Sequence, residues 1–429
     1  MSVFARRIFV AFALALLTSV VVAATSDWPQ WRGENRENKS SYKGLRTDWD
    51  ANPPALVAQI KGMGAGYASV SVFGDRLYTT GNRDGAQCVV AVDLTKNDVA
   101  WVTPITDGVP KHGYDGSRTT PTVDGDFLYV VSSDGVLSCL KRDNGSVVWS
   151  KDFKKEFGGK MHSGWGFSES PLIDGDRVLA TPGGKDAMIV CLNKKDGSLI
   201  WKSAFEKGGD AGGDGAAYSS IVISNAAGIK QYVTLVGRGL VGVDAKDGKQ
   251  LWTYNRIANK TANIPTAIVR DDYVLGSSGY NDGGTALLKL DKEGTGIKAS
   301  EVYYMTNKDL QNHHGGMVLD GDHVYMGHGH NNGFPMCFEF LTGKKKWDDG
   351  RGPDGGSAAV TWVDGHMIFR YQKEGTVALI KASPDKYELV GKFKPAFKEK
   401  ESWAQPVVAN GKLYLREQDQ LMIYDVAKK

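Results

Sequence analysis

Histidine and aspartate are the side chains whose spacing in this sequence could bind a metal ion. His328 and His330 form a His-x-His pair, and His323 lies shortly before them. Alternate imidazoles on one strand face could chelate a transition metal. The cluster falls at or just beyond the second strand of an expected hairpin and has no partner cysteine, so we expect a surface or turn cluster. The residues leave open whether it binds a metal.

The other motifs assemble no catalytic constellation. The loop 208–215 (GGDAGGDG) supplies Asp210 and Asp214 but lacks the closing glutamate of a calcium loop. Residues 62–66 (GMGAG) resemble half of a dinucleotide fingerprint, but we expect no helix to follow them. The sequence has no Gly-x-Ser-x-Gly elbow, zinc-protease motif or phosphate-binding loop. We therefore assign no catalytic residue and expect no metal.

A repeat of about 50 residues must position any side chains that do chemistry. Each copy has alternating apolar residues, a polar turn with glycine, and a tryptophan shortly after that glycine. The clear copies are 138–149 (SCLKRDNGSVVW), 190–201 (VCLNKKDGSLIW) and 241–252 (VGVDAKDGKQLW). A shortened copy spans 338–347, and the copy at 90–101 has Asn97 in the place of the glycine.

A second repeated element precedes each copy and predicts another hairpin. Examples are 121–131 (PTVDGDFLYVV), 171–181 (PLIDGDRVLAT) and 317–327 (MVLDGDHVYMG), where apolar residues alternate around a Gly-Asp turn. Two hairpins per period make four short antiparallel strands, which is one propeller blade. With the degenerate copies counted, the sequence predicts an all-β, eight-bladed β-propeller. Residues 55–60 (ALVAQI) would supply the outer strand that the last blade lacks and close the ring.

The tryptophans and cysteines of the repeats have structural interpretations. We expect each tryptophan to pack between neighbouring blades and to donate a hydrogen bond from its indole N–H. Cys139, Cys191 and Cys337 occupy the same third-strand position of three separate blades. Equivalent positions in different blades point away from one another, so we expect buried apolar thiols rather than disulfides.

Superposing the repeats predicts a ring of side chains at one mouth of the central channel. The start of the innermost strand, and the loop leading to it, holds aromatic, cationic and imidazole groups. Such groups suit a pocket for an anionic or planar ligand. A solvated channel mouth would have the same polarity, and the two readings stay open. The candidate binding residues are Tyr67, Arg118, His162, Trp165, Ser168, Glu169, Tyr218, His314 and Trp403.

The first residues predict export. Arg6 and Arg7 precede an apolar run over 8–22 that ends in Ala23 and Ala24, which is typical of a signal peptide. We expect a signal peptide at 1–24, a lead segment at 25–54 and the propeller at 55–429. No cysteine lies near the cleavage point, so we expect a periplasmic or secreted monomer without a lipid anchor. The formal net charge of +3 leaves no electrostatic footprint for nucleic acid.

The repeats and the segment 28–33 (WPQWRG) resemble the PQQ-like propeller repeat. Quinoprotein alcohol dehydrogenases and BamB-like propellers share this repeat, so the resemblance implies the fold but leaves the function open. For the dehydrogenases it implies pyrroloquinoline quinone held with calcium against a disulfide between adjacent cysteines. This sequence has no such pair. If chemistry exists, Glu169 or His162 is the base to examine first.

We therefore expect an exported, non-catalytic binding or scaffold propeller for a protein partner in the cell envelope, with no cofactor. Two alternatives stay open. One is an oxidoreductase that uses pyrroloquinoline quinone with calcium at the axial ring. The other is a glycan-binding propeller that uses exposed aromatic residues such as Trp165 and Trp403.

Overall fold

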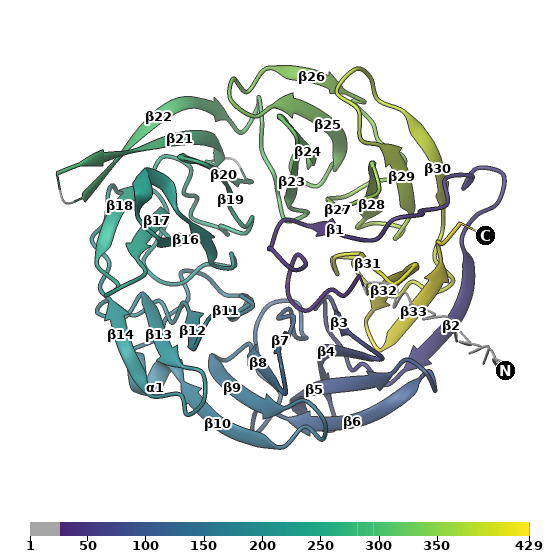
Figure 1. Cartoon of the computed structure of the whole chain (residues 1–429), viewed down its shortest axis with the longest axis horizontal. Helices are drawn as coiled ribbons and strands as arrows, with labels where there is room; N and C mark the ends of the chain where they lie inside the picture. Colours follow the sequence, from purple (N-terminus) through teal and green to yellow (C-terminus); the bar gives the residue numbers. More distant parts are fainter. Residues whose placement is uncertain (1–25, 281, 295, 429) are drawn as a thin grey trace, which may run out of the picture.

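The repeats fold into eight separate sheets that surround one axis (Figure 1). The computed structural model describes residues 26–280, 282–294 and 296–428. The predicted signal peptide, 1–24, lies outside them. Nearly all regular structure in the described residues is β, so the predicted all-β, eight-bladed propeller is confirmed. Each blade is antiparallel, and its first strand lies nearest the axis.

The strands of the first four blades follow in order along the chain. Blade 1 contains β3 (Ser71–Phe73), β4 (Arg76–Arg83), β5 (Ala86–Asp93) and β6 (Asp98–Pro104). Blade 2 contains β7 (Thr122–Asp124), β8 (Phe127–Val131), β9 (Val136–Lys141) and β10 (Val147–Asp152). Blade 3 contains β11 (Leu172–Asp174), β12 (Arg177–Ala180), β13 (Ile189–Asn193) and β14 (Leu199–Ser203). Blade 4 contains β15 (Val222–Ser224), β16 (Gln231–Val236), β17 (Gly239–Asp244) and β18 (Gln250–Tyr254).

The remaining blades continue the same order. Blade 5 contains β19 (Ile268–Arg270), β20 (Tyr273–Ser278), β21 (Gly284–Glu293) and β22 (Gly296–Thr306). Blade 6 contains β23 (Met317–Asp320), β24 (His323–His328), β25 (Phe334–Glu339) and β26 (Lys345–Asp348). Blade 7 contains β27 (Ala358–Val363), β28 (His366–Tyr371), β29 (Val377–Lys381) and β30 (Leu389–Phe393). Blade 8 contains β31 (Val407–Ala409), β32 (Lys412–Glu417) and β33 (Gln420–Asp425). Two short helices lie between strands, α1 (Phe153–Phe157) and the 3-10 helix η1 (Ala226–Gly228).

The ring closes as the sequence predicts. Strand β2 (Ala55–Lys61) pairs antiparallel with β33 and becomes the outer strand of blade 8. The pairing ties a segment near the start of the propeller to its last strand, so neither blade 1 nor blade 8 is left as an open end. One strand is additional to the prediction, because β1 (Lys39–Ser40) of the lead segment pairs in parallel with β27.

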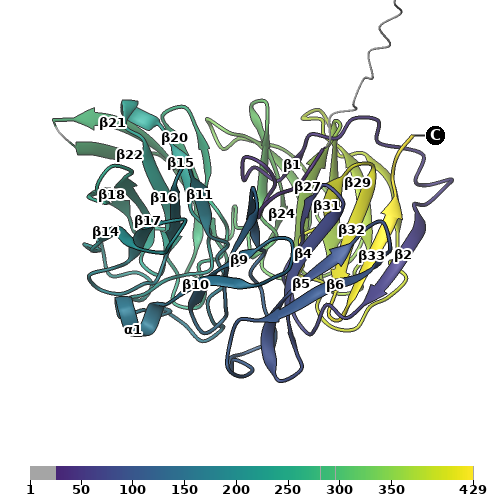
Figure 2. The same cartoon turned by 60° about the horizontal axis from the view of Figure 1, so that its bottom comes forward.

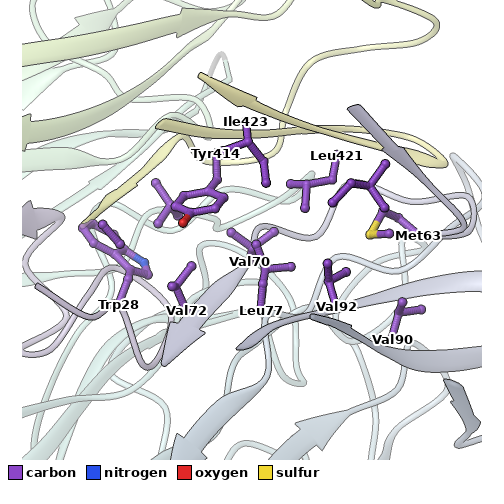
Figure 3. Packing of buried hydrophobic residues seen from close by; sticks show 13 residues of the cluster. Trp28, Met63, Val70, Val72, Leu77, Val90, Val92, Tyr414, Leu421 and Ile423 are labelled. Carbon is purple, nitrogen blue, oxygen red and sulfur yellow. The ribbon is translucent and has the colours of Figure 1, made fainter. Parts of the chain in front are cut away.

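An apolar cluster seals the seam between blades 8 and 1 (Figure 3). Val72 and Leu77 of blade 1 are fully buried with Tyr414 and Leu421 of blade 8, and Trp28 of the lead segment completes the cluster. Full burial of one such aliphatic side chain is worth about 1.5–3 kcal/mol. The lead segment is therefore part of the core that holds the ring closed.

The tryptophans pack between blades, as predicted, but the predicted hydrogen bond is not general. The indole N–H of Trp201 is buried without a partner, and that of Trp252 donates to Gln231 of its own blade. Trp149 donates to the carbonyl of Lys194 in the next blade (3.1 Å), and Trp347 donates to the carbonyl of Ser383 (2.8 Å). The turn glycine of the next blade lies directly against the indole. A Cβ at Gly197 would be 2.8 Å from the Trp149 ring, and the φ of Gly197 is +71°. Glycine is thus needed at this turn for its backbone conformation and for close packing.

The cysteines are buried and free, as predicted. Cys139, Cys191 and Cys337 lie directly across from the tryptophan of their own blade. Burial raises the pKa of Cys139 to about 11 and that of Cys191 to about 12. These thiols serve as small apolar groups in the sheets.

Candidate functional site

The lead segment crosses the axis and closes one end of the central channel (Figure 1). The guanidinium of Arg32 donates to the carbonyls of Thr266 (3.1 Å) and Met317 (2.7 Å), at the innermost strands of blades 5 and 6. An arginine suits this position, because one planar guanidinium can donate to several carbonyls. The segment therefore forms a floor across the axis.

Arg36 fixes the same floor to the other side of the ring. Its Nη1 donates to the carbonyls of Ser170 and Ile221, both at 3.0 Å, and its Nη2 donates to the carbonyl of Pro171. These carbonyls lie just before the innermost strands of blades 3 and 4. The two arginines together tie four blades to one non-repeat segment.

A cavity of about 380 Å³ lies on the axis against this floor. Its wall is mainly aromatic, with Trp31 and Asn38 from the lead segment and side chains from the loops between blades. All but two of the predicted ring residues line it. The predicted residues in the wall are Tyr67, Arg118, Trp165, Ser168, Tyr218, His314 and Trp403.

Glu169 and His162 lie behind the wall. Glu169 is 2% exposed, and its Oε1 accepts a hydrogen bond from the backbone N–H of Thr181. Burial raises its pKa to about 7, against the smaller opposing effects of the Thr181 hydrogen bonds and the charge of Arg36. Successive residues of an extended segment point to opposite sides, so Ser168 reaches the cavity and Glu169 cannot.

His162 packs against the back of the cavity wall. Its Nδ1 is 3.1 Å from the carbonyl oxygen of Ala216, so Nδ1 carries the proton and donates. Its ring centroid lies 5.7 Å from that of Tyr218, a wall residue. Burial is the largest cause that lowers the pKa of His162. The histidine supports Tyr218 and stays neutral.

Arg118 organises the loop at the cavity mouth. Its guanidinium donates to the carbonyls of Tyr114 (2.7 Å), Gly113 (2.8 Å) and Trp165 (2.9 Å), and it lies 5.5 Å from the ring centroid of Tyr67. Burial lowers the pKa of Arg118 to about 10, so the side chain remains charged at neutral pH. Arg118 thus places a positive charge in the wall, while most of its N–H groups donate to backbone carbonyls of the loops at the cavity mouth.

Three imidazoles meet in another part of the wall. The ring centroid of His313 is 4.0 Å from that of His314 and 4.3 Å from that of His330. Burial lowers the pKa of His314 to about 3 and lowers that of His313 further, and the neighbouring imidazoles add to the effect. All three rings are therefore present as neutral imidazoles at physiological pH.

The predicted cluster of His323, His328 and His330 does not converge. The first two lie at opposite ends of β24, and Nδ1 of His328 accepts from the backbone N–H of Gln311 (3.3 Å). Only His330 reaches the cavity wall. Over residues 26–428, leaving out positions 281 and 295, no group of three or more His, Cys, Asp or Glu side chains is arranged to hold a metal ion.

Some residues of the cavity wall have a left-handed backbone conformation. Tyr114, Tyr280 and Asn331 have φ values of +55°, +67° and +54°, and all three line the wall. Positive φ is rare for bulky side chains, and such residues gather at sites where the surroundings enforce them. Sequence reasoning missed Tyr280, His330 and the lead-segment residues, because none of them occupies the repeat position used to find the ring.

Three comparisons place the chain among known proteins. The family model described as outer membrane protein assembly factor BamB matches residues 85–349. The BamB of Shewanella oneidensis is 24% identical over 193 residues, which are 44% of this chain and 42% of that protein. The chain therefore aligns with less than half the length of that curated relative.

Solved propellers of two kinds resemble the fold. BamB from Moraxella catarrhalis has a TM-score of 0.61 at 15% identity, covering 87% of this chain and 99% of that one. The quinohemoprotein alcohol dehydrogenase of Comamonas testosteroni has a TM-score of 0.63 at 12% identity, covering 94% and 81%. A europium-containing methanol dehydrogenase has a TM-score of 0.65 at 12% identity, covering 91% and 89%. At these identities the likeness concerns the fold alone.

Proposed function

This chain belongs to the family described as outer membrane protein assembly factor BamB, and we propose that it is an exported, non-catalytic scaffold that binds a protein partner in the cell envelope. The predicted signal peptide supports export. The family description makes a component of outer-membrane protein assembly the partner class to test first. No helix among the described residues has the length and hydropathy needed to span a bilayer.

The partner would dock on the face where the cavity opens. In a four-stranded antiparallel blade, the connection to the next blade lies on the same face as the turn between the second and third strands. The cavity wall is built from these connections, and α1 belongs to one of them. Figure 2 shows α1 on one face of the ring and the β21–β22 hairpin on the other. Since the lead segment closes the opposite side, only the α1 face offers the cavity to a partner.

One loop of that face carries the observation on which the proposal rests. In the connection 105–121, Tyr114 is 55% exposed and Val109 is 42% exposed. Arg118 holds the backbone of Tyr114 in its strained conformation, so the tyrosine is presented rigidly. A rigid exposed aromatic residue costs little conformational entropy on binding and is typical of an interface anchor.

The cavity does not fit a quinone bound with calcium. Calcium prefers several oxygen ligands, among which carboxylates dominate. Among the described residues that line the cavity, none is Asp or Glu. The nearest predicted candidate, Glu169, is directed to Thr181 behind the wall. We therefore derive no redox step at this site.

The glycan alternative has no supporting surface at the predicted residues. Trp165 and Trp403 are only partly exposed and line the cavity instead of forming a flat platform. The ring of Trp403 is packed against Tyr67, Tyr114 and His314 at centroid distances of 4.7, 4.8 and 5.1 Å. An extended sugar chain therefore finds no open aromatic face there.

Site-specific photocrosslinking in the intact envelope tests the proposal. A photoreactive phenylalanine analogue replaces Tyr114 in one variant and Ile200, an exposed residue on the outer strand β14, in the matched control. We expect a discrete adduct with one envelope protein from position 114 and none from position 200. Equal adducts from both positions, or none from 114 in a folded, exported protein, would overturn the proposal.

A further inference from the structure

The axial cavity has the size of a small-molecule site. Its volume of about 380 Å³ falls within the range of pockets that enclose organic ligands, about 300–1,000 Å³. The lead segment closes the cavity on the side away from the α1 face, and its Trp31 and Asn38 contribute to the floor. The volume and the closed floor therefore make this space a candidate site for a small organic molecule.

The arrangement of rings favours a planar ligand. Trp403 is surrounded by tilted or edge-on rings, and Tyr280 meets His313 edge-on at a centroid distance of 4.9 Å. Further aromatic side chains, including Trp31, Trp165 and Tyr218, line the same enclosed space, and an aromatic ligand in it would meet them in offset or edge-to-face contact. The wall is thus suited to a flat unsaturated group.

The charge of the wall favours an anion. Arg118 and Arg32 both line the cavity, and burial lowers the pKa of each to about 10, so both stay protonated. No carboxylate is among the described lining residues. The acidic residues that act on these arginines, Asp115 and Glu37, are exposed on the outside. A cationic ligand would be repelled and an anionic one attracted.

Several buried polar atoms of lining residues lack a partner. Asn38 is 1% exposed, and neither of its side-chain amide atoms has a hydrogen bond. The indole N–H of Trp403 and the Nε2 of His313 are also buried without a partner. Leaving such groups unpaired costs about 1–3 kcal/mol each. Since the indole N–H and the amide NH₂ are donors, a ligand rich in acceptor oxygens would satisfy them.

We propose that the axial cavity binds a small planar aromatic carboxylate without a metal ion. The aromatic wall stacks against the ring, and the charge of Arg118 and Arg32 balances the carboxylate. The strained backbone at Tyr114 and Tyr280 holds the wall in its binding geometry. The site goes beyond the scaffold role, because it takes a small molecule inside the ring, although Tyr114 at the mouth belongs both to the cavity wall and to the proposed partner surface.

Titration of the purified protein in EDTA tests the proposal with three naphthalene probes of the same shape. These are the carboxylate, the neutral carboxamide and the methylammonium, followed by calorimetry and tryptophan fluorescence. We expect one-to-one binding of the carboxylate, with the carboxamide at least about tenfold weaker, because a charged acceptor strengthens each hydrogen bond. The ammonium should not bind. Equal binding of all three, or no binding of the carboxylate, would overturn the proposal, as would binding that needs calcium.

Two matched tryptophan substitutions locate the site. Trp403→Phe keeps a ring but removes the unpartnered indole N–H. Trp362→Phe removes an indole N–H that already donates to Asp320 (3.1 Å), outside the cavity lining. We expect the first to weaken binding of the carboxylate by about fivefold or more and the second to leave it unchanged. The same loss in both variants would place the site elsewhere. Tyr114 lines the cavity as well, so the titrations use protein with the natural Tyr114, and the crosslinking is scored only by the protein adduct. Each proposal can therefore fail while the other stands.

Discussion

Glu169 is a buried carboxyl group whose ionisation should make the fold weaker as the pH rises. Its Oε1 accepts from the N–H of Thr181, and its Oε2 is buried without a partner. Burial is the main cause that raises its pKa from 4.5 to about 7. Glu169→Gln keeps the shape and the acceptor oxygen but cannot ionise. The substitution therefore isolates the contribution of this one titration.

The direction of the pH dependence follows from the number of protons that the folded and unfolded states bind. Between pH 4.5 and about 7 the folded protein keeps the proton on Glu169 and the unfolded chain loses it. The folded state then binds more protons, so its free energy of unfolding falls as the pH rises through this window. A shift of about 2.5 pKa units, at about 1.4 kcal/mol each, gives about 3.5 kcal/mol in total, of which about 3 kcal/mol falls between about pH 4.5 and pH 8. The loss is complete about one pH unit above the folded-state pKa.

Urea unfolding of the wild type and the Glu169→Gln variant measures the effect. We expect the variant to gain about 3 kcal/mol relative to the wild type between about pH 4.5 and pH 8. The buried imidazoles of His313 and His314, whose pKa values are lowered, act in the opposite direction, but they are present in both proteins and cancel in the difference. Glu293→Gln, at an exposed hairpin position, is the control and should show no such trend. A difference in the free energy of unfolding between Glu169→Gln and the wild type that does not change with pH would refute the reasoning.

Two further predictions concern packing within the ring. Trp149→Ala should lower the free energy of unfolding by about 3–5 kcal/mol, because the indole fills the space between blades. Gly197→Ala should also destabilise the protein, but less so in the Trp149→Ala background, where the clash at 2.8 Å is absent. Additive effects in urea unfolding would contradict this coupling. The second prediction is that all four cysteines are inert to a thiol reagent in the native protein and react on denaturation, because they are buried. Rapid native labelling of any of them would contradict the packing.

The fold could be predicted because each sequence repeat encodes one blade of the propeller. Each period carries the same alternation and turns, so one copy predicts the strands of the next. The closure by β2 followed from the count, since blade 8 contains only three consecutive strands of its own. The same symmetry of the repeats explains why seven of the nine predicted ring residues line one cavity. A fixed position in the repeat maps to a fixed distance from the axis, and residues such as Tyr67 and Arg118 could be grouped without any contact being known.

The repeats predict the cavity lining wrongly where a residue lies outside the repeated positions or where the direction of its side chain decides. Glu169 was grouped with Ser168 because they are adjacent, but an extended chain sends adjacent side chains to opposite sides. Tyr280 and His330 lie in turns between second and third strands, whose length varies from blade to blade. No periodicity predicts which of those turns reaches the axis. Their contribution needed the three-dimensional arrangement.

The packing of the lead segment against blade 7 could not be predicted from the repeats. Blade 7 has Gly391, opposite Leu379, at the position where blades 1 to 4 and blade 6 have tryptophan. The main chain at Trp49 in the lead segment lies against Gly391 instead, and the Trp49 ring meets Phe393 edge-on at a centroid distance of 5.7 Å. A degenerate repeat is thus completed by a residue far away in the sequence. Sequence comparison within the repeats finds only the missing tryptophan.

The same segment determines what the axis can do. Eight similar blades alone would surround an open channel lined by the starts of their innermost strands. Arg32 and Arg36 satisfy carbonyls at those strands and close the channel, which turns a passage into a pocket with one mouth. The side chains at the floor of the pocket then come from residues outside the repeat, such as Trp31 and Asn38. Propellers with equal blades can therefore differ in ligand through the residues of this segment that line the cavity, while Trp28, Arg32 and Arg36 of the same segment hold the ring together.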